Sequence, residues 1–201
     1  IPGGFNTIDF PFFNDCNTAI SEFPSGGPCG EGDQKWQRVL EAEPVQFIVF
    51  DGVNYLANTR AALAQFIGCP DKDDLVMVTN PSFAINLIAK NFPLNEGDEI
   101  LATDIEYGAC DRTWDYYCKK NKAIYRRQKI NLPITSKEKF IEEFFAGITP
   151  KTKAIMLAHT LGNPFNLDLV EKLAKRHNLW VIEDSCDGLG GTYRGKNLGS
   201  F

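Results

Sequence analysis

From residue 31 onward, short apolar runs alternate with segments in which apolar residues recur at helical spacing. The apolar runs are continuous rather than alternating, as in strands that are buried on both faces of a parallel sheet. Strands separated by helices of this length form βαβ units, which favour a mostly parallel sheet. The sequence therefore predicts an α/β fold with three layers, α/β/α, around that sheet.

The predicted elements follow from periodicity, caps and breakers. Strands are expected over 75–79, 99–103, 123–130, 153–158 and 180–182. Helices are expected over 34–43, 54–67, 82–91, 108–120, 136–146 and 167–177, with Pro81 as the first residue of the third. Residues 1–30 are rich in Gly, Pro, Asn and Phe, which predicts an irregular N-terminal arm before a large domain over 31–201.

Composition excludes several classes of function. A chain of 201 residues that is 43% hydrophobic can bury one sizeable core. The net charge of −5, without a basic stripe, argues against a nucleic acid partner. No apolar stretch approaches a membrane span, and the N-terminus lacks the regions of a signal peptide. These features predict a cytoplasmic protein with no membrane partner.

The cysteines and histidines do not suggest a metal site. None of the six cysteines forms a C-x-x-C pair, and the two histidines lie far from any cysteine cluster. A zinc site is therefore not expected. Scattered cysteines in a chain of this size indicate reduced thiols.

The run 180–188 is the most informative for function. Its apolar strand leads into Asp184, at the carboxyl edge where open α/β sheets bind ligands. An Asp fixed there can keep a ring nitrogen protonated, a contact that pyridoxal 5'-phosphate (PLP) needs if its ring is to act as an electron sink. The alternative is an ordinary Asp that caps a turn.

Three more loops are expected at the same edge. The first places a strand end before a helix N-terminus, which is an anion site, or else a simple turn capped by Ser82. In the second, Tyr107 either lies over a planar cofactor or packs. In the third, His159 is either a site residue or a structural histidine. Together with Asp184 these loops fit a phosphorylated pyridine ring, and no Walker or G-x-G-x-x-G pattern competes.

The chain resembles the large domain of fold type I PLP-dependent enzymes, the aspartate aminotransferase superfamily, and two branches share the resemblance. Residues 34–157, with Glu106-Tyr107-Gly108-Ala109, resemble the class V aminotransferases, the branch of isopenicillin N epimerase. Residues 149–201, with His159-Thr160-Leu161-Gly162-Asn163-Pro164 and Glu183-Asp184-Ser185-Cys186-Asp187, resemble the sugar aminotransferase branch, which includes CDP-4-keto-6-deoxyglucose 3-dehydrase.

The resemblance implies roles for individual residues. Asp184 would pair with the pyridinium nitrogen, and Tyr107 would stack on the ring. His159 would lie near the 3-hydroxyl of the ring or the substrate. Asp187 occupies the position that faces this hydroxyl, and an Asp there favours the sugar 3-dehydrase comparison.

The phosphate group would be held by the loop around Ser82. The cofactor-binding residues expected there are Asn80, Ser82 and Phe83. Pro81 contributes no N–H and Phe83 no hydroxyl, so this loop departs from the family pattern. Catalytic roles are expected for His159 and Asp184.

The resemblance also implies a Schiff-base lysine in a segment after Phe201. The large domain is therefore expected to be incomplete, and the chain alone inactive, or an inert fragment. For the parent protein, the main expectation is a PLP enzyme of the class V type, an epimerase, lyase or transaminase that acts on an amino acid. The alternative is a nucleotide-sugar aminotransferase or 3-dehydrase that uses PLP or its amine form, PMP. A homodimer is implied in either case.

Overall fold

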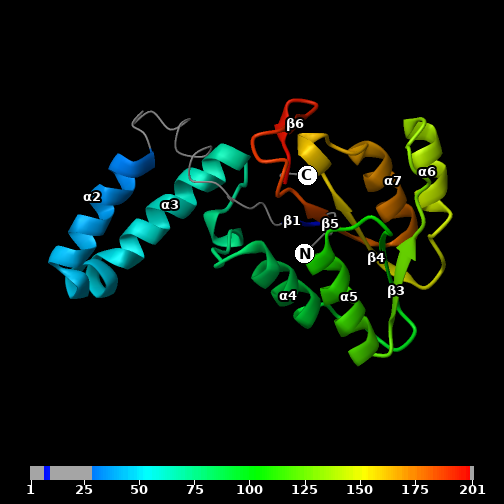
Figure 1. Cartoon of the computed structure of the whole chain (residues 1–201), viewed down its shortest axis with the longest axis horizontal. Helices are drawn as coiled ribbons and strands as arrows, with labels where there is room; N and C mark the ends of the chain where they lie inside the picture. The colour runs from blue at the N-terminus through cyan, green and yellow to red at the C-terminus, as the bar shows by residue number, and fades with distance from the viewer. Residues whose placement is uncertain (1–6, 10–28, 200–201) are drawn as a thin grey trace. The chain divides into compact units, whose positions relative to one another are not determined.

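The computed structural model (Figure 1) describes the backbone of residues 7–9 and 29–199 and the side chains of residues 35–199. These residues form two compact units. The larger unit contains residues 7–9 and 78–199, and the smaller unit contains residues 29–77. None of the helices that are described is long and apolar enough to cross a membrane.

The larger unit is built on a parallel sheet. Its five strands have the order β1-β5-β4-β2-β3, and every neighbouring pair is parallel. They are β1 (Thr7–Asp9), β2 (Glu99–Thr103), β3 (Ile124–Gln128), β4 (Thr152–Ala158) and β5 (Trp180–Asp184). A separate antiparallel ribbon pairs β6 (Thr192–Tyr193) with β7 (Lys196–Asn197). The predicted α/β fold with a mostly parallel sheet is confirmed.

Four helices accompany this sheet, and local side chains fix where they begin. They are α4 (Pro81–Asn91), α5 (Gly108–Lys120), α6 (Lys137–Phe145) and α7 (Leu167–His177). Asn80, Ser136 and Asn166 each accept the N–H of the residue three positions later, which satisfies one of the free donors in the first turn. Pro81 is the first residue of α4, as predicted.

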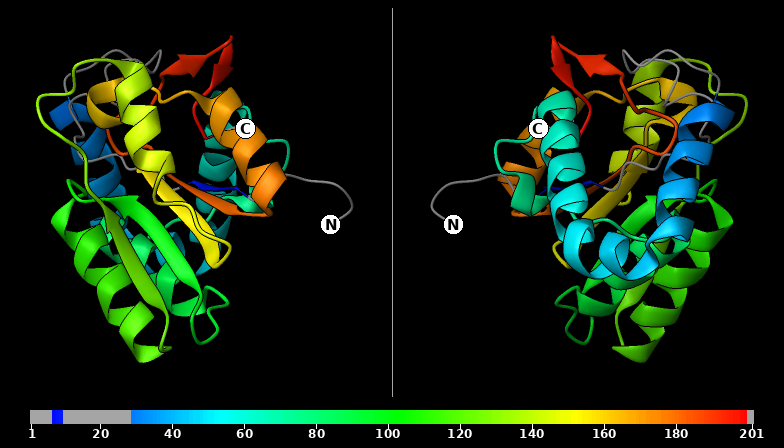
Figure 2. Two further views of the ribbon diagram at one scale, coloured as in Figure 1. Left: turned by 90° about the vertical axis from the view of Figure 1, so that its right-hand side faces the viewer. Right: turned by 90° about the vertical axis from the view of Figure 1, so that its left-hand side faces the viewer.

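The two faces of the sheet carry different helices because side chains alternate along each strand. Ile100, Met156 and Ile182 belong to a core that contains residues of α4 and α5. Leu101, Ile155 and Val181 belong to a second core, with residues of α6 and α7. Figure 2 shows α5 and α7 on opposite sides of the strands. This arrangement is the predicted α/β/α layering.

The smaller unit is helical. It contains α2 (Cys29–Ala42), a π-helical segment (Gln46–Asp51), α3 (Gly52–Ile67) and a 3-10 turn (Lys72–Asp74). The rings of Trp36, Phe47 and Tyr55 pack together with centroid separations of 5.1–6.1 Å. Helix α3 ends at Gly68, whose φ of 78° is left-handed and therefore favours glycine.

The predicted strand over 75–79 is wrong. The segment has no regular structure, and the side chain of Val76 is 72% exposed. A strand is stable only when neighbouring strands pair with it, and no strand among the described residues does so here. The apolar composition of the run could not supply that partner.

The predicted irregular arm over 1–30 differs from the structure in two places. Thr7–Asp9 forms β1, which pairs with β5, and α2 already begins at Cys29. The rest of the arm, residues 1–6 and 10–28, lies outside the described residues. The domain boundary at residue 31 stays a prediction.

Candidate active site

Three strands of the larger unit end at one edge of the sheet. Because the sheet is parallel, the carboxyl ends of β2, β4 and β5 lie together, and Ala158 pairs with Asp184 in the last rung between β4 and β5. Strand β5 runs two residues beyond the predicted 180–182, so Asp184 is its final residue. The loops after these strands supply the candidate residues.

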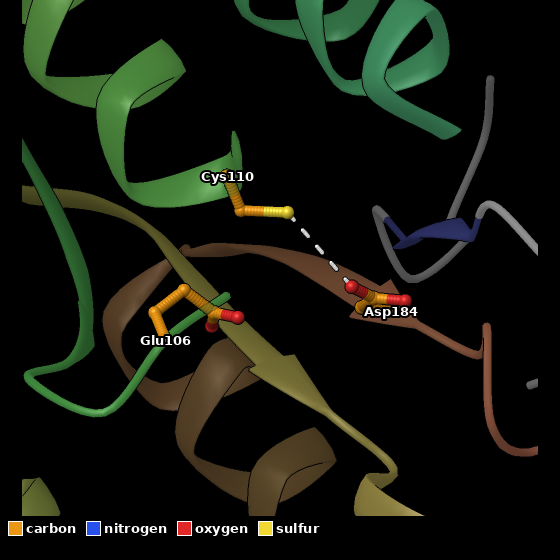
Figure 3. A group of neighbouring side chains, drawn as sticks. All are labelled: Glu106, Cys110 and Asp184. Atoms are coloured by element: carbon orange, nitrogen blue, oxygen red, sulfur yellow. Dashed lines mark hydrogen bonds between the residues drawn. The ribbon is translucent and has the colours of Figure 1, made fainter. Parts of the chain in front are cut away.

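Asp184 is 7% exposed and lies on the face of β5 that carries Ile182, which is the face covered by α4 and α5. Its Oδ1 accepts the backbone N–H of Cys186 at 3.0 Å. Its Oδ2 faces the thiol of Cys110, in the first turn of α5, at 3.9 Å (Figure 3). A thiol is a weak donor, so Oδ2 retains the capacity to accept a strong hydrogen bond.

A second carboxyl group lies beside Asp184. Glu106 follows β2, and its carboxyl oxygen, the Cys110 sulfur and an Asp184 oxygen all lie within 4.8 Å of one another (Figure 3). Glu106 accepts the backbone N–H of Tyr107 at 2.7 Å. Burial, with smaller effects of the charges on Asp184 and Asp111, raises the pKa of Glu106 from its usual 4.5 to about 7.

Sequence reasoning did not select Glu106 or Cys110 as site residues. Glu106 stands in the motif that suggested Tyr107, but the motif alone does not say that its carboxyl turns toward β5. Cys110 lies one turn into a helix, 74 positions from Asp184, and only packing brings the two together. The available signal was that both residues belong to the segment that follows β2 at the carboxyl edge of the sheet.

The two thiols near Asp184 are held in the protonated form. Burial, and then the negative charge of Asp184, raise the pKa of Cys110. Burial and a hydrogen bond to Asp184 do the same to the pKa of Cys186. Metal ions bind the thiolate, so the group formed by Glu106, Cys110 and Asp184 is poorly suited to a metal despite its compact geometry.

The predicted phosphate loop is a capped helix N-terminus. The side-chain oxygen of Asn80 accepts the N–H of Phe83 at 2.8 Å, so Asn80, rather than Ser82, is the cap of α4. Pro81 has no N–H, and Ser82 is exposed. The N–H and the hydroxyl of Ser82 are therefore the donors that this first turn offers to an anion.

Tyr107 is the residue that precedes α5, and its side chain is 68% exposed. It stands next to Glu106 in the loop that reaches toward Asp184. A ring this exposed is free to lie against a planar ligand. Its predicted role in stacking stays a prediction.

His159 does not join the Asp184 group. It is fully buried, its Nε2 lies 2.9 Å from Oε2 of Glu183, and its ring stacks on Phe165 at 4.2 Å. His159 lies two residues after Leu157, and alternate residues of a strand point to the same face. His159 is therefore on the face covered by α6 and α7. The structure thus places His159 and Asp184 on opposite faces of the sheet, and the predicted catalytic role of His159 stays a prediction.

Asp187 connects two loops. Its Oδ2 accepts the backbone N–H of Leu161 at 3.0 Å, and Leu161 has a left-handed φ of 55°. Asp187 therefore ties the loop after β5 to the loop after β4. Its predicted contact with the 3-hydroxyl of a bound ring would need its other carboxylate oxygen.

The residues around Asp184 fit PLP in their chemistry. A nearly buried carboxylate with one oxygen facing only a weak donor suits a protonated pyridine nitrogen. The acidic surroundings of this carboxylate also favour a cation, since Glu106 lies beside it. The first turn of α4 suits an anion, although with few donors.

Comparison with known proteins gives the family. Residues 32–201 match the DegT/DnrJ/EryC1/StrS aminotransferase family. The lipopolysaccharide biosynthesis protein RfbH of Salmonella typhimurium is 34% identical over 148 residues, which are 69% of this chain and 32% of that protein. The dTDP-4-dehydro-2,6-dideoxy-D-glucose 3-dehydratase of Saccharopolyspora spinosa is 55% identical over 56 residues, 28% of this chain and 12% of that protein.

Solved structures of related enzymes have a similar fold. The chain superposes with a TM-score of 0.57 on a mutant of GDP-4-keto-6-deoxymannose-3-dehydratase (ColD) with bound GDP-perosamine, at 25% identity over 74% of this chain and 38% of that chain. Cysteine desulfurases are also among the matches, as the class V resemblance predicts. The chain spans a third or less of the length of the two curated relatives named above.

Proposed function

Because the chain belongs to the DegT/DnrJ/EryC1/StrS aminotransferase family, whose members are PLP-dependent, we propose that it forms the cofactor-binding part of an enzyme that acts on a nucleotide-linked keto sugar. The predicted cofactor, PLP, is the cofactor of this family. The relatives named for their reactions include sugar 3-dehydratases and a sugar transaminase. They support the sugar alternative better than the amino acid chemistry that was the main expectation.

The single observation that carries the proposal is the Asp184 carboxylate at the carboxyl end of β5. It is nearly buried, its Oδ1 is held by the Cys186 N–H, and its Oδ2 faces the Cys110 thiol, which is a weak donor. This carboxylate would accept the N–H of a bound pyridine ring and keep that nitrogen positive. PLP, when bound, supplies an electron sink for bonds that break next to its imine carbon.

Other residues of the larger unit would bind and orient the cofactor. The Ser82 N–H and hydroxyl would donate to the phosphate, aided by the positive end of α4. The exposed ring of Tyr107 would lie over the pyridine face and exclude water from it. Asp187 would hold the loop at Leu161 in position next to the site.

A test uses the complete protein that carries this chain. It would be incubated with PLP or PMP and a nucleotide-linked 4-keto-6-deoxy sugar, with and without glutamate as amino donor, and the products would be weighed by mass spectrometry. Loss of a sugar hydroxyl, or gain of an amine, supports the proposal and separates the two sugar reactions. No change in the sugar, with PLP demonstrably bound, contradicts it.

Two variants sharpen this test. Asp184→Asn keeps the shape of the side chain and removes the negative charge, so turnover is expected to fall by at least about a hundredfold. Glu96→Gln removes an exposed carboxylate in the loop before β2 and serves as the matched control. An Asp184→Asn protein with full activity would remove Asp184 from the proposed role.

A second candidate, PLP chemistry on a free amino acid, has one specific observation in its favour. The chain also matches cysteine desulfurases, which share the class V resemblance of residues 34–157. Release of sulfide or amine from cysteine, or racemisation of an amino acid, without turnover of nucleotide sugars, would favour it. A homodimer, which the resemblance implies, would be tested by light scattering during gel filtration.

A further inference from the structure

Glu106 and Asp184 bring two carboxyl groups together where Asp184 is buried and Glu106 is partly buried. Their oxygens lie within 4.8 Å of each other, with the Cys110 sulfur completing the triangle (Figure 3). Glu106 comes from the loop after β2 and Asp184 from the end of β5, with β4 between these strands in the sheet. Two negative charges this close repel each other, so the pair favours a state that keeps one proton.

The two carboxyl groups differ in their partners. Asp184 accepts a backbone N–H from Cys186 and faces the Cys110 thiol. Glu106 accepts a backbone N–H from Tyr107, but burial outweighs this contact and raises the pKa of Glu106 to about 7. The proton therefore resides on Glu106 in slightly acidic solution.

The groups that interact electrostatically with Glu106 do not supply a compensating cation. They are Asp184 on β5, Cys110 and Asp111 on α5, and Tyr125 on β3. Arg127, which stacks on Tyr125 at 4.6 Å, is paired with Asp111 and Asp115. A cation that entered beside Asp184 would be a partner that the described side chains around this acidic group do not supply.

We propose that Glu106 is a positioning residue for Asp184, which keeps the shared proton on itself and the charge on Asp184, and which releases that proton to solvent when a cationic ring binds. This inference rests on the proposed function, because it takes a pyridinium ring as the cation. Below neutrality the carboxyl pair carries one negative charge, and with the ring bound it carries two. Glu106 thereby links cofactor binding to pH.

The first measurement follows Glu106 itself. Glutamate labelled with ¹³C at the side-chain carboxyl would be incorporated into the complete protein, and the carboxyl signals would be titrated by NMR. One glutamate is expected to titrate near pH 7, and Glu106→Gln is expected to remove that signal. Glu96→Gln, at an exposed carboxylate, should leave it in place. If all glutamates titrate near their usual pH, the proposal is overturned.

The second measurement tests the coupling to Asp184. In Asp184→Asn the neighbouring charge is gone, so the midpoint of the Glu106 titration is expected to fall by about one pH unit. An unchanged midpoint would show that burial alone acts on Glu106 and would overturn the proposal. This arm needs no substitution at Glu106, so it stands even if Glu106→Gln does not fold.

The third measurement links the pair to the cofactor. Calorimetric titration with PLP at pH 7, in buffers with different ionisation enthalpies, gives the number of protons released on binding. The wild-type protein is expected to release about half a proton more than Glu106→Gln. Equal release would overturn the proposal. If Asp184→Asn shifts the Glu106 midpoint but the wild-type protein does not bind PLP, the electrostatic coupling between the two carboxyl groups stands and the proposed function is contradicted.

Discussion

Two neighbouring acidic residues of β5, Glu183 and Asp184, lie on opposite faces of the sheet and have different surroundings. On the face covered by α6 and α7, Glu183 is fully buried and bonded to His159, which is itself covered by Phe165. On the face covered by α4 and α5, Asp184 borders the loop of Glu106 and the exposed Tyr107. One pair is sealed inside the core, whereas the other includes the partly buried Glu106 beside an exposed loop residue, Tyr107.

The difference shows that two residues adjacent in the sequence can have different roles. Glu183 and Asp184 are adjacent, but the pleat of β5 sends them to opposite faces. In the sealed pair, Nε2 of His159 and Oε2 of Glu183 are fixed by each other, whereas Nδ1 of His159 and Oε1 of Glu183 are buried with no hydrogen-bond partner among the described residues. Beside Asp184 lie a backbone N–H, the Cys110 thiol and the Glu106 carboxyl group, and the nearby acid suits the binding of a cation. Four sets of substitutions test this comparison.

The largest effect is expected on the sealed face. Glu183→Ala removes the partner of His159 and leaves a cavity and an unpaired buried ring nitrogen, so the free energy of unfolding should fall by about 3–5 kcal/mol. Urea unfolding followed by circular dichroism measures it. Asp184→Asn, on the other face, should change stability by less than about 1 kcal/mol. Similar losses in the two variants would remove the distinction between the faces.

The next effect concerns pH on the ligand face. Because the pKa of Glu106 is raised from 4.5 to about 7 in the folded protein, the folded state binds its proton more tightly than the unfolded state. This contribution to stability is full below pH 4.5 and is lost as the pH rises to about 7. It amounts to on the order of 3 kcal/mol, because one pKa unit corresponds to about 1.4 kcal/mol.

Urea unfolding at mildly acidic and mildly alkaline pH checks this linkage. The difference between the two conditions should shrink in Glu106→Gln, which cannot ionise, and should persist in Glu96→Gln. A Glu106→Gln protein with the same pH dependence as the wild type would contradict it.

A smaller effect is expected at Gly162, in the loop that follows β4. Its φ of 75° is left-handed, and a Cβ there would lie 3.2 Å from the carbonyl oxygen of Asp187. Gly162→Ala should therefore lower the free energy of unfolding by about 1–2 kcal/mol. Gly97 is the matched control, since its φ of 86° is also left-handed but nothing lies within 4 Å of its added Cβ. An equal loss in both would mean that the contact with Asp187 adds nothing.

The smallest effect is expected at the helix caps. Asn80→Ala, on α4, and Ser136→Ala, on α6, should each lower stability by about 1 kcal/mol, because each removes the acceptor of one N–H in a first turn. Only Asn80→Ala also frees an N–H, that of Phe83, at the predicted phosphate loop. Its thermal midpoint should therefore gain more from added phosphate than that of Ser136→Ala. Equal gains would argue against an anion site at α4.

Much of the larger unit could be predicted from local patterns. The bounds of β2, α5 and α7 agree with the predicted ranges, since an apolar run or a helical repeat with good terminal residues is a local property. The run over 75–79 had the same apolar character but no strand to pair with among the residues that the structure describes. A strand depends on a partner that lies elsewhere in the chain, which a local pattern cannot show.

The site was predicted in part. The acid at the end of β5 was identified from its position, and Asn80 to Phe83 do form a helix N-terminus. Side chains alternate between the two faces along β4 and β5, and this alternation places His159 and Asp184 on opposite faces. The sequence could not show this, because it does not reveal that Ala158 pairs with Asp184. Glu106 and Cys110 could not be assigned, because the contact with Asp184 depends on how α5 and its preceding loop pack on the sheet.

The sequence by itself determined the alternating α/β architecture, the bounds of α5 and α7 and the place of Asp184 at a strand end, because these depend on neighbours a few residues apart. Tertiary structure alone decided that Glu183 would be sealed with His159 and that Asp184 would meet Glu106 and Cys110. The reason is physical: the charge and hydrogen-bonding state of a buried acid is set by the groups that surround it in space, and here those groups come from segments far away in the chain.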